Sequence, residues 1–273
     1  MTTAVAIVGG TGKLGSIIRA VIDESSDFEV SAVLSSNSAL SELDGADLVV
    51  DASIPAVSID VVRAATERGI NVLVGTSGWS AERISLVRPL IENAGNGVVF
   101  VPNFSLGSVI GSAIAAAAAP FFPSIEIVEA HRESKVDSPS GTAVRTAELI
   151  AAARAGVGPV ASPHVDQRAR GQQIASVPIH SLRRPGVVAR QETVLSGPGE
   201  SLSIVHDTID PSAAYAPGIR LALPAARDAM GITIGLDSFV EIGIRHTSER
   251  SRANANGVAE GNVPGQVART TGA

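Results

Sequence analysis

The order of apolar and polar positions along the chain predicts strands that alternate with helices in its first part. Short apolar runs that indicate strands lie at residues 4–8, 28–34, 46–52, 71–74 and 98–101. Between them, apolar residues recur with a helical period of about 3.6 residues. These helical segments cover residues 16–22, 56–68 and 81–93. Because such alternation gives a parallel sheet covered on both faces, this part predicts an α/β domain.

After residue 103 the pattern changes. A helix of small residues, a strand and a second helix are expected at residues 106–119, 124–130 and 142–155. Residues 156–173, rich in Pro, Gly and Arg, indicate a loop. Three antiparallel strands and a helix are then expected at residues 175–182, 187–195, 201–205 and 211–230. We therefore expect a smaller α+β domain with a mixed or antiparallel sheet over residues 104–215, and a disordered polar tail over residues 247–273.

Composition narrows the class of protein. The 273-residue chain is 45% apolar, enough for a substantial core. Its net charge of -6 argues against nucleic acid as a partner, and no apolar run is long enough to cross a membrane. The chain has no cysteine and no histidines at metal-ligand spacing, so no metal site is expected. No signal peptide is apparent either, and we expect a cytoplasmic protein.

A glycine-rich loop follows the first predicted strand. Gly9, Gly12 and Gly15 form a G-x-x-G-x-x-G sequence that opens the first predicted helix. In this setting the glycines permit a tight turn, close approach of the backbone to a pyrophosphate, and packing of the helix on the sheet. The loop therefore predicts a Rossmann-type dinucleotide-binding domain over residues 1–103. Further candidate contacts between the glycines are Thr11, Lys13 and Leu14.

The end of the second predicted strand bears on the choice of cofactor. A carboxylate there would bind the ribose hydroxyls and repel a 2′-phosphate, but this chain has Ser35. With Lys13 as a counter-charge, NADPH is favoured as cofactor, and NADH stays open. Ligands gather at the carboxyl ends of strands in open α/β sheets, so more cofactor contacts are expected after the fourth and fifth strands. These candidates are Gly75, Thr76, Ser77, Pro102, Asn103 and Phe104.

Residues 129–142 combine groups that suit the reduction of an anionic substrate. His131 can supply a proton near neutral pH, and so can Lys135 if desolvation lowers the pKa of its ammonium group. The next predicted helix begins after a proline, at Ser140, Gly141 and Thr142. Amides at a helix start bind a carboxylate without a side-chain charge. With the glycine-rich loop, this stretch predicts a small dehydrogenase that acts on an acidic substrate.

These segments resemble the 4-hydroxy-tetrahydrodipicolinate reductase family (dihydrodipicolinate reductases), which serves diaminopimelate and lysine biosynthesis. The resemblance runs in order from the first residues to about residue 246. Its most specific segment is EAHRESKVDSPSGTA at residues 129–143. The other segments are VGGTGKLG at 8–15, VGTSGW at 74–79, VPNFS at 101–105, IHSLR at 179–183 and IVHD at 204–207.

The resemblance implies a function and an assembly. It implies reduction of a cyclic unsaturated dicarboxylate imine with NADH or NADPH, in a homotetramer assembled by the second domain. The chain would return to the dinucleotide domain over about residues 216–246. By this resemblance, His131 lies at the proposed acid position, Lys135 contacts the substrate, and Gly141 with Thr142 binds a carboxylate. Whether His131 or Lys135 donates the proton stays open.

Departures from the family's pattern bear on the substrate. The family typically has two adjacent histidines where this chain has His131 and Arg132. Arg132 still offers a cation for a substrate carboxylate, whereas Glu133 adds a negative charge beside the anion site. Asp210 and Pro211 stand where many members carry an arginine. Two alternatives therefore remain: a related reductase of a different imino acid, and an NADPH-binding sensor without turnover.

Overall fold

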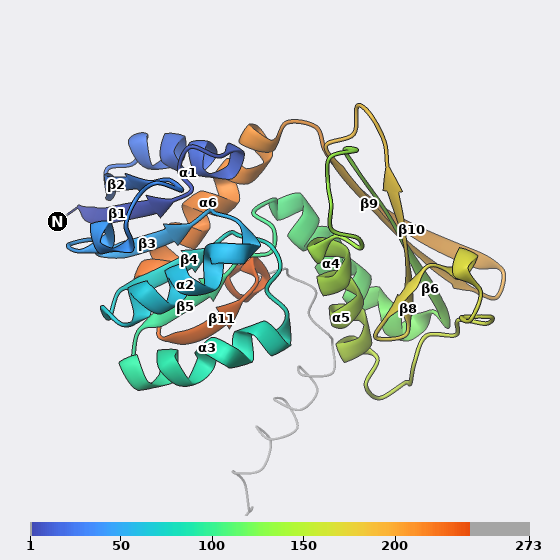
Figure 1. Ribbon diagram of the computed structural model, residues 1–273. Coiled ribbons are helices and arrows are strands. Elements are labelled where there is room, and N and C mark those ends of the chain that lie inside the picture. The colour runs from blue at the N-terminus through green and yellow to red at the C-terminus, as the bar shows by residue number, and fades with distance from the viewer. Residues whose placement is uncertain (1, 241–273) are drawn as a thin grey trace, which may run out of the picture. The chain divides into compact units, whose positions relative to one another are not determined.

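The apolar strands of the first part form a six-stranded parallel sheet, here called sheet A, in a computed structural model that describes residues 2–240 (Figure 1). The strand order is β11-β5-β4-β3-β1-β2. The strands are β1 (Thr3–Val8), β2 (Phe28–Leu34), β3 (Leu48–Asp51), β4 (Asn71–Val74), β5 (Gly97–Phe100) and β11 (Gly231–Ile234). All paired strands run parallel, as the alternation of strands and helices predicts.

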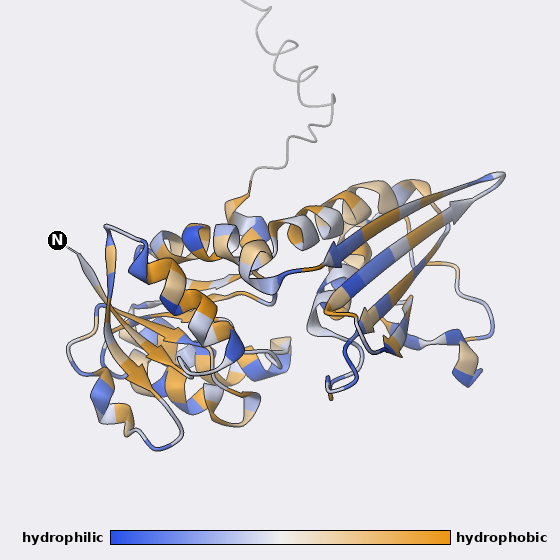
Figure 2. Cartoon of the chain, turned by 90° about the horizontal axis from the view of Figure 1, so that it is seen from above, coloured by the Kyte–Doolittle hydropathy of each residue, from blue (hydrophilic) through white to orange (hydrophobic). Residues whose placement is uncertain are grey.

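Helices cover both faces of sheet A. Val5 and Ile7 of β1 lie in one core cluster with α1 (Lys13–Asp23) and α6 (Pro211–Arg227). The residues between them, such as Ala6, face a second cluster with α2 (Pro55–Thr66) and α3 (Ala81–Ala94). Successive strand residues point to opposite faces, so burial of both faces requires near-continuous apolar strands. In Figure 2, the strands of sheet A are accordingly mostly orange.

A second sheet, here called sheet B, has five strands in the order β10-β9-β6-β8-β7. Its strands are β6 (Ser124–His131), β7 (Gln172–Ile174), β8 (Val177–Arg183), β9 (Ala189–Gly197) and β10 (Glu200–Thr208). β8 pairs with β6 in parallel orientation, and the other pairs are antiparallel. Sheet B is therefore mixed, and its central strand β6 leads directly into the stretch that carries the candidate catalytic residues.

Two helices pack on one face of sheet B. They are α4 (Leu106–Ala118) and α5 (Gly141–Ala153), and their small side chains, such as Ala115 and Ala147, lie in one core cluster with Ile125 and Ile127 of β6. In Figure 2 the long strands of this sheet alternate between orange and blue. This alternation is typical of a sheet with one face against helices and one polar face.

The arrangement of strands in sheet B shows which of the expected strands are neighbours. Strands at residues 187–195 and 201–205 correspond to the antiparallel pair β9 and β10, which is confirmed. The strand expected at residues 175–182 is not their neighbour, because β6 lies between β8 and β9. A hydrophobic pattern specifies which face of a strand is buried, but it does not determine which other strand pairs with it.

Two short strands were missed in the sequence. β7 begins inside the loop expected at residues 156–173, and β11 follows α6 without any prior expectation. Two glutamines make β7 mostly polar, and Gly231 and Thr233 interrupt the apolar residues of β11, so neither strand forms an apolar run. The tail expected at residues 247–273 lies outside the described residues, and the domain boundaries stay predictions.

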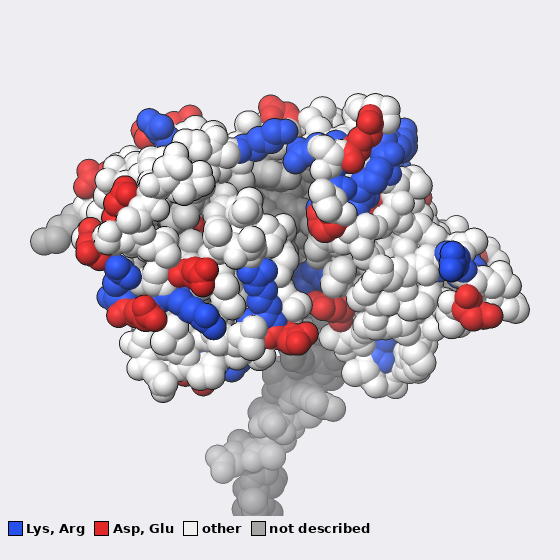
Figure 3. All heavy atoms as spheres, viewed as in Figure 1, with Lys and Arg blue, Asp and Glu red and all other residues white. Residues whose placement is uncertain are grey.

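Charged groups of both signs are interspersed on the face shown in Figure 3. Among residues 2–240, surface ion pairs include Arg68 with Asp44 at 2.7 Å and Lys135 with Asp137 at 2.8 Å. Among residues 2–240, no helix combines the length and the apolar character needed to cross a bilayer.

Candidate active site

The glycine-rich loop makes a tight turn between β1 and α1. Gly9 has φ +80°, and a Cβ on it would lie 2.5 Å from the carbonyl oxygen of Ala52. A Cβ on Gly15 would lie 2.3 Å from the carbonyl oxygen of Gly9, so only glycine fits at either position. Gly12 precedes α1 and provides no side-chain cap. The first amides of α1 are therefore open to an anion, which fits the pyrophosphate of a dinucleotide.

Three loops meet at the carboxyl edge of sheet A. A Cβ on Gly75 would lie 2.8 Å from the ring of Phe104 and 2.9 Å from Leu14. The structure thus brings together candidate cofactor residues from the first turn of α1 and from the loops after β4 and β5. The carbonyl oxygen of Asp51 accepts hydrogen bonds from the Gly75 amide at 2.8 Å and the Thr76 hydroxyl at 3.3 Å. Ligands bind at this edge in open α/β sheets.

The remaining cofactor candidates lie in the same loops or at the end of β2. The side chains exposed there are Thr11, Lys13, Ser77 and Pro102. Ser35 directly follows β2, and its hydroxyl accepts a hydrogen bond of 3.4 Å from the Asn37 amide. The structure leaves these groups accessible at one edge of sheet A, and their contacts with a cofactor stay predictions.

A buried carboxylate at the same edge was missed in the sequence. Asp51, at the end of β3, is fully buried and accepts hydrogen bonds from the amide and hydroxyl of Ser53 at 3.0 Å and 2.5 Å. It also accepts from the Ser58 hydroxyl, which in turn accepts a bond of 2.8 Å from the indole of Trp79. This network connects the loops after β3 and β4, so Asp51 stabilises the edge where the cofactor candidates lie.

Glu129 is the centre of the second group of candidates. Its fully buried carboxylate lies 2.5 Å from Nδ1 of His131, two residues further along β6. Both oxygens accept hydrogen bonds from Nη1 of Arg183, at 3.0 Å and 3.1 Å, and the Ser140 amide donates to Oε1 at 3.3 Å. Residues two apart on a strand face the same side, and that spacing is the signal that could have revealed the Glu129–His131 pair.

The charge state of Glu129 follows from this environment. Burial disfavours its ionised form, but hydrogen bonds from His131, Ser181 and Arg183 outweigh burial and lower the pKa of this carboxyl to about 2. Glu129 is therefore a carboxylate at neutral pH. Because it holds Nδ1 of His131, Nε2 is the ring nitrogen left for a ligand.

The loop between β6 and α5 is held by Arg183. Its Nε and Nη2 donate to the carbonyl oxygens of Lys135 and Asp137, at 3.2 Å and 2.6 Å. The ammonium group of Lys135 contacts both carboxylate oxygens of Asp137 at 2.8 Å. A substrate carboxylate would have to replace Asp137 to pair with Lys135. Arg183 thus connects the Lys135 loop to Glu129, a role that its position in the sequence left open.

Some polar groups at the start of α5 are bound within the protein, and others are available to a ligand. The Ser140 hydroxyl accepts a hydrogen bond of 3.2 Å from the Ala143 amide, and the Ser140 amide is bound to Glu129. Both groups of Ser140 therefore cap the helix and position the loop. The amides of Gly141 and Thr142 are the first of α5 and have no carbonyl partner within the helix. The Thr142 hydroxyl lies 3.1 Å from Nδ2 of Asn103.

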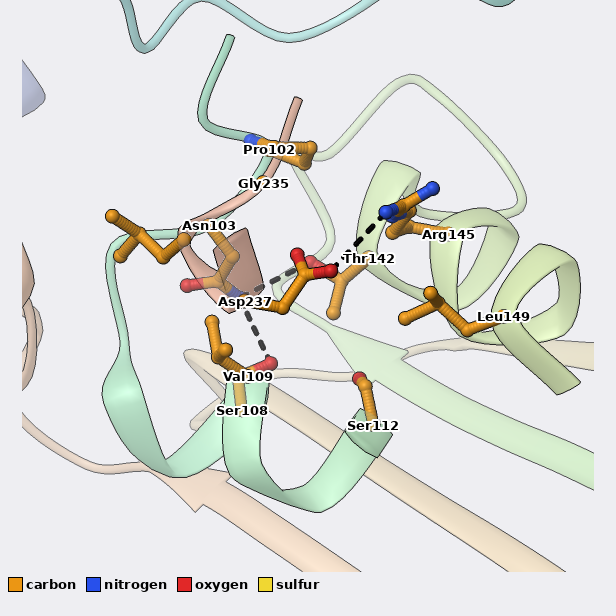
Figure 4. Close-up of a pocket in the computed structure, with 11 residues that line it drawn as sticks. Pro102, Asn103, Ser108, Val109, Ser112, Thr142, Arg145, Leu149, Gly235 and Asp237 are labelled. Atoms are coloured by element: carbon orange, nitrogen blue, oxygen red, sulfur yellow. Dashed lines mark hydrogen bonds and ion pairs between the residues drawn. The ribbon is translucent and has the colours of Figure 1, made fainter. Parts of the chain in front are cut away.

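A pocket borders the start of α5 (Figure 4). It is lined by Pro102, Asn103, Ser108, Val109, Ser112, Thr142, Arg145, Leu149, Gly235, Leu236 and Asp237. His131 and Lys135 do not line this pocket, and Thr142 belongs both to it and to the start of α5.

Arg132 is exposed, and its positive charge partly offsets the burial that raises the pKa of Tyr215 in α6. Arg132 therefore lies within electrostatic reach of α6.

The chain is similar to known proteins along most of its length. A family model described as "Dihydrodipicolinate reductase, N-terminus" matches residues 3–104, and one described as "Dihydrodipicolinate reductase, C-terminus" matches residues 107–240. A 4-hydroxy-tetrahydrodipicolinate reductase of Clavibacter sepedonicus is 52% identical over 278 residues, with all of both chains covered. Another, of Nocardia farcinica, is 40% identical over 89% of this chain and 100% of its own.

Among solved structures, a dipicolinate-bound dihydrodipicolinate reductase of Paenisporosarcina sp. TG-14 has a TM-score of 0.69 and 25% identity, covering 88% of this chain and 100% of its own. An amine dehydrogenase of Mycobacterium smegmatis, at 11% identity and a TM-score of 0.61 over 90% of this chain and 98% of its own, shares the fold alone. With both family models and a full-length relative matched, this chain belongs to the dihydrodipicolinate reductase family of NAD(P)H-dependent oxidoreductases.

Proposed function

We propose that this chain reduces 4-hydroxy-tetrahydrodipicolinate to tetrahydrodipicolinate with NADPH or NADH. The observation that carries the proposal is the grouping of His131, the Lys135 loop and the start of α5 around Glu129 and Arg183. In the overall reaction the 4-hydroxyl leaves as water, and one hydride and one proton are added. A bound dinucleotide supplies the hydride. The groups just named supply the proton and bind the carboxylates.

Each side chain has a distinct task in this proposal. His131, held through Nδ1 by Glu129, presents Nε2 as a proton donor, and Lys135 is the competing donor. Lys135 released from Asp137 pairs with one carboxylate of the substrate. The amides of Gly141 and Thr142 bind the other carboxylate at the positive end of α5. Arg132 adds positive charge nearby.

We further propose that NADPH is preferred over NADH. Ser35 stands where a carboxylate would repel a 2′-phosphate, and the exposed side chain of Lys13 lies at the start of α1. These are the residues that would contact the adenosine ribose. A higher kcat/KM with NADPH than with NADH would support this preference, and a clearly higher kcat/KM with NADH would contradict it.

The test is a coupled assay with synthase-generated substrate and each cofactor. We expect the purified chain to oxidise the cofactor, and we expect His131→Ala and Lys135→Ala to lower kcat by about 100-fold or more with little change in KM for the cofactor. His180→Ala is the matched control, because His180 also pairs with a glutamate, Glu126, at 2.8 Å.

The outcomes separate the alternatives. Activity on other imines but not on this substrate would favour a related reductase with a different imino acid. Tight binding of NADPH without turnover of any imine would favour a sensor. Full activity in both the His131 and Lys135 variants would show that the roles assigned to them are wrong.

We also propose a homotetramer assembled through sheet B. α4 and α5 cover the face that carries Ile125 and Ile127. On the opposite face, Leu182 and Val205 are 43% and 45% exposed. These two apolar side chains lie on a face that otherwise carries polar side chains, and they gain stability when another chain covers them.

A further inference from the structure

The side chain of Asn103 connects the end of β5 with the starts of two helices. Its Oδ1 accepts a hydrogen bond of 2.8 Å from the Ser105 amide. Its Nδ2 donates to the hydroxyls of Ser108 in α4 and Thr142 in α5, both at 3.1 Å. Figure 4 shows the two Nδ2 bonds as dashed lines that diverge from Asn103. Both protons of Nδ2 and one lone pair of Oδ1 thus have partners.

The orientation of this amide is fixed by chemistry. The backbone N–H of Ser105 can only donate, so the atom of Asn103 that faces it must be the carbonyl oxygen. A flipped amide would place a donor against this donor and would direct its oxygen toward Thr142. The NH2 group therefore faces Thr142 and Ser108.

The direction of the next hydrogen bond follows. Nδ2 of an amide has no acceptor capacity, so the Thr142 hydroxyl must accept from Asn103. The proton of that hydroxyl then has to point to another acceptor. Because Thr142 lies in the first turn of α5, its O–H and its backbone N–H both belong to the helix start where we place a substrate carboxylate.

We propose that Asn103 is a positioning residue for substrate binding, which keeps the Thr142 hydroxyl as a hydrogen-bond donor to the carboxylate. Its role rests on the proposed function, which places a carboxylate at the start of α5. The donor direction runs from the Ser105 amide through the Asn103 amide and the Thr142 hydroxyl to the substrate. Such a donor suits an acceptor oxygen, and a carboxylate is a stronger acceptor than the oxygen of a neutral carboxyl or amide group because it is charged.

The sequence suggested that backbone carbonyls in the loop of Asn103 contact the cofactor, which leaves the side chain of Asn103 free for another role. The structure commits its side chain to three protein partners, so a side-chain contact with the nicotinamide would require one of these bonds to break. The two uses predict different kinetic effects. A cofactor contact affects KM for NADPH, whereas a positioning residue affects binding of the dicarboxylate.

The test is a double-mutant cycle between Asn103 and Thr142. Asn103→Leu removes both donors at similar size, and Thr142→Val removes the hydroxyl. We expect each single variant to raise KM for the substrate by about tenfold, the effect of losing a hydrogen bond to a charged group. We expect the double variant to be no worse than Thr142→Val, because Asn103 acts through Thr142.

Two further variants guard against trivial effects. Ser108→Ala is the matched control, since it removes the other partner of Nδ2 and leaves the Thr142 bond in place. It should keep KM for the substrate within twofold of the wild type. If Asn103→Leu fails to fold, Asn103→Asp has the same size and removes the same donors. When Thr142→Val is also present, Asn103→Asp should raise KM for the substrate only through the repulsion between the added charge and the substrate.

Affinity for dipicolinate, measured by calorimetry with NADPH bound, separates this role from the proposed function. Wild-type protein that binds dipicolinate but shows no turnover would contradict the proposed function. The double-mutant cycle could then still be completed with affinities for dipicolinate in place of KM. Multiplicative losses in the double variant, a selective rise in KM for NADPH, or a wild type that does not bind dipicolinate would each overturn the positioning role.

Discussion

Glu129 shows how a single buried carboxylate can organise a site. Its two oxygens contact His131, Arg183 and the Ser140 amide, which belong to β6, β8 and the start of α5. Replacing one member leaves the others partly unpaired in a buried setting, which costs more than the pair itself contributes. Glu129 therefore affects both the orientation of His131 and the stability of the fold.

The pH dependence of stability should report on Glu129. Its folded-state pKa of about 2 lies below the ordinary value of 4.5, so the folded state binds the proton more weakly than the unfolded state does. This contribution, ~3 kcal/mol at most, is fully present above about pH 4.5 and is lost as the pH falls toward 2. Denaturant unfolding of the wild type at several pH values in this range should show the loss.

The comparison variant is Glu129→Gln. It should be less stable than the wild type by about 3 kcal/mol at neutral pH, and the gap should narrow as the pH falls. Glu133→Gln, at an exposed position of the following loop, should keep the wild-type profile. A constant gap across the pH range would mean that the Glu129 carboxyl is not ionised in the folded protein.

The candidate residues of the site could be chosen from the sequence, whereas the contacts that orient them required the structure. His131, Lys135 and Thr142 could be chosen from the sequence because residue types suited to proton transfer and anion binding lie close together. The contacts that orient them could not, since Arg183 is distant in sequence and reaches the site through the parallel pairing of β8 with β6. Without that pairing, nothing distinguishes Arg183 from the other arginines as a partner of Glu129.

At the scale of elements, two glycines within helices provide a matched comparison. Gly15 in α1 lies against the backbone of Gly9, where a Cβ would come within 2.3 Å of an oxygen. Gly111 in α4 has room, since its nearest neighbour, Ile204, would be 3.8 Å from a Cβ. Both are helical, so alanine should improve the intrinsic helix propensity equally.

We expect opposite outcomes for the two substitutions. Gly15→Ala should lower the free energy of unfolding by about 2 kcal/mol or more and weaken NADPH binding, because α1 must move away from the glycine-rich loop. Gly111→Ala should be neutral or stabilising by up to ~1 kcal/mol. Denaturant unfolding and titration with NADPH measure the two effects. Equal stability changes would show that helix packing at Gly15 is looser than the structure indicates.

The elements differ in how well their sequence specifies them. Strands β1 to β5 of sheet A were predicted because burial on both faces leaves runs such as Leu48–Asp51 nearly free of polar residues. β8 and β9 were also found, but their separation by β6 depends on long-range pairing that no local pattern encodes. β11, with four half-buried residues, was missed because Gly231 and Thr233 interrupt its apolar residues.

At the scale of the whole molecule, the proposed assembly can be tested through sheet B. Light scattering should give four times the mass of one chain for the wild type. Val205→Lys should lower that mass, because it places a charge on the proposed interface. Ile209→Lys is the control, since Ile209 is 87% exposed just after β10. A wild type with the mass of one chain would contradict the homotetramer.

The pairing of β11 with β5 has a consequence for biogenesis. Sheet A receives its final strand after all of sheet B has been synthesised, so β5 presents an open edge while the nascent chain leaves the ribosome. Unpaired edges recruit other strands, and they do so most readily in incomplete chains. We therefore expect the nascent chain to be most prone to pairing with other strands in the interval between translation of β5 and of β11.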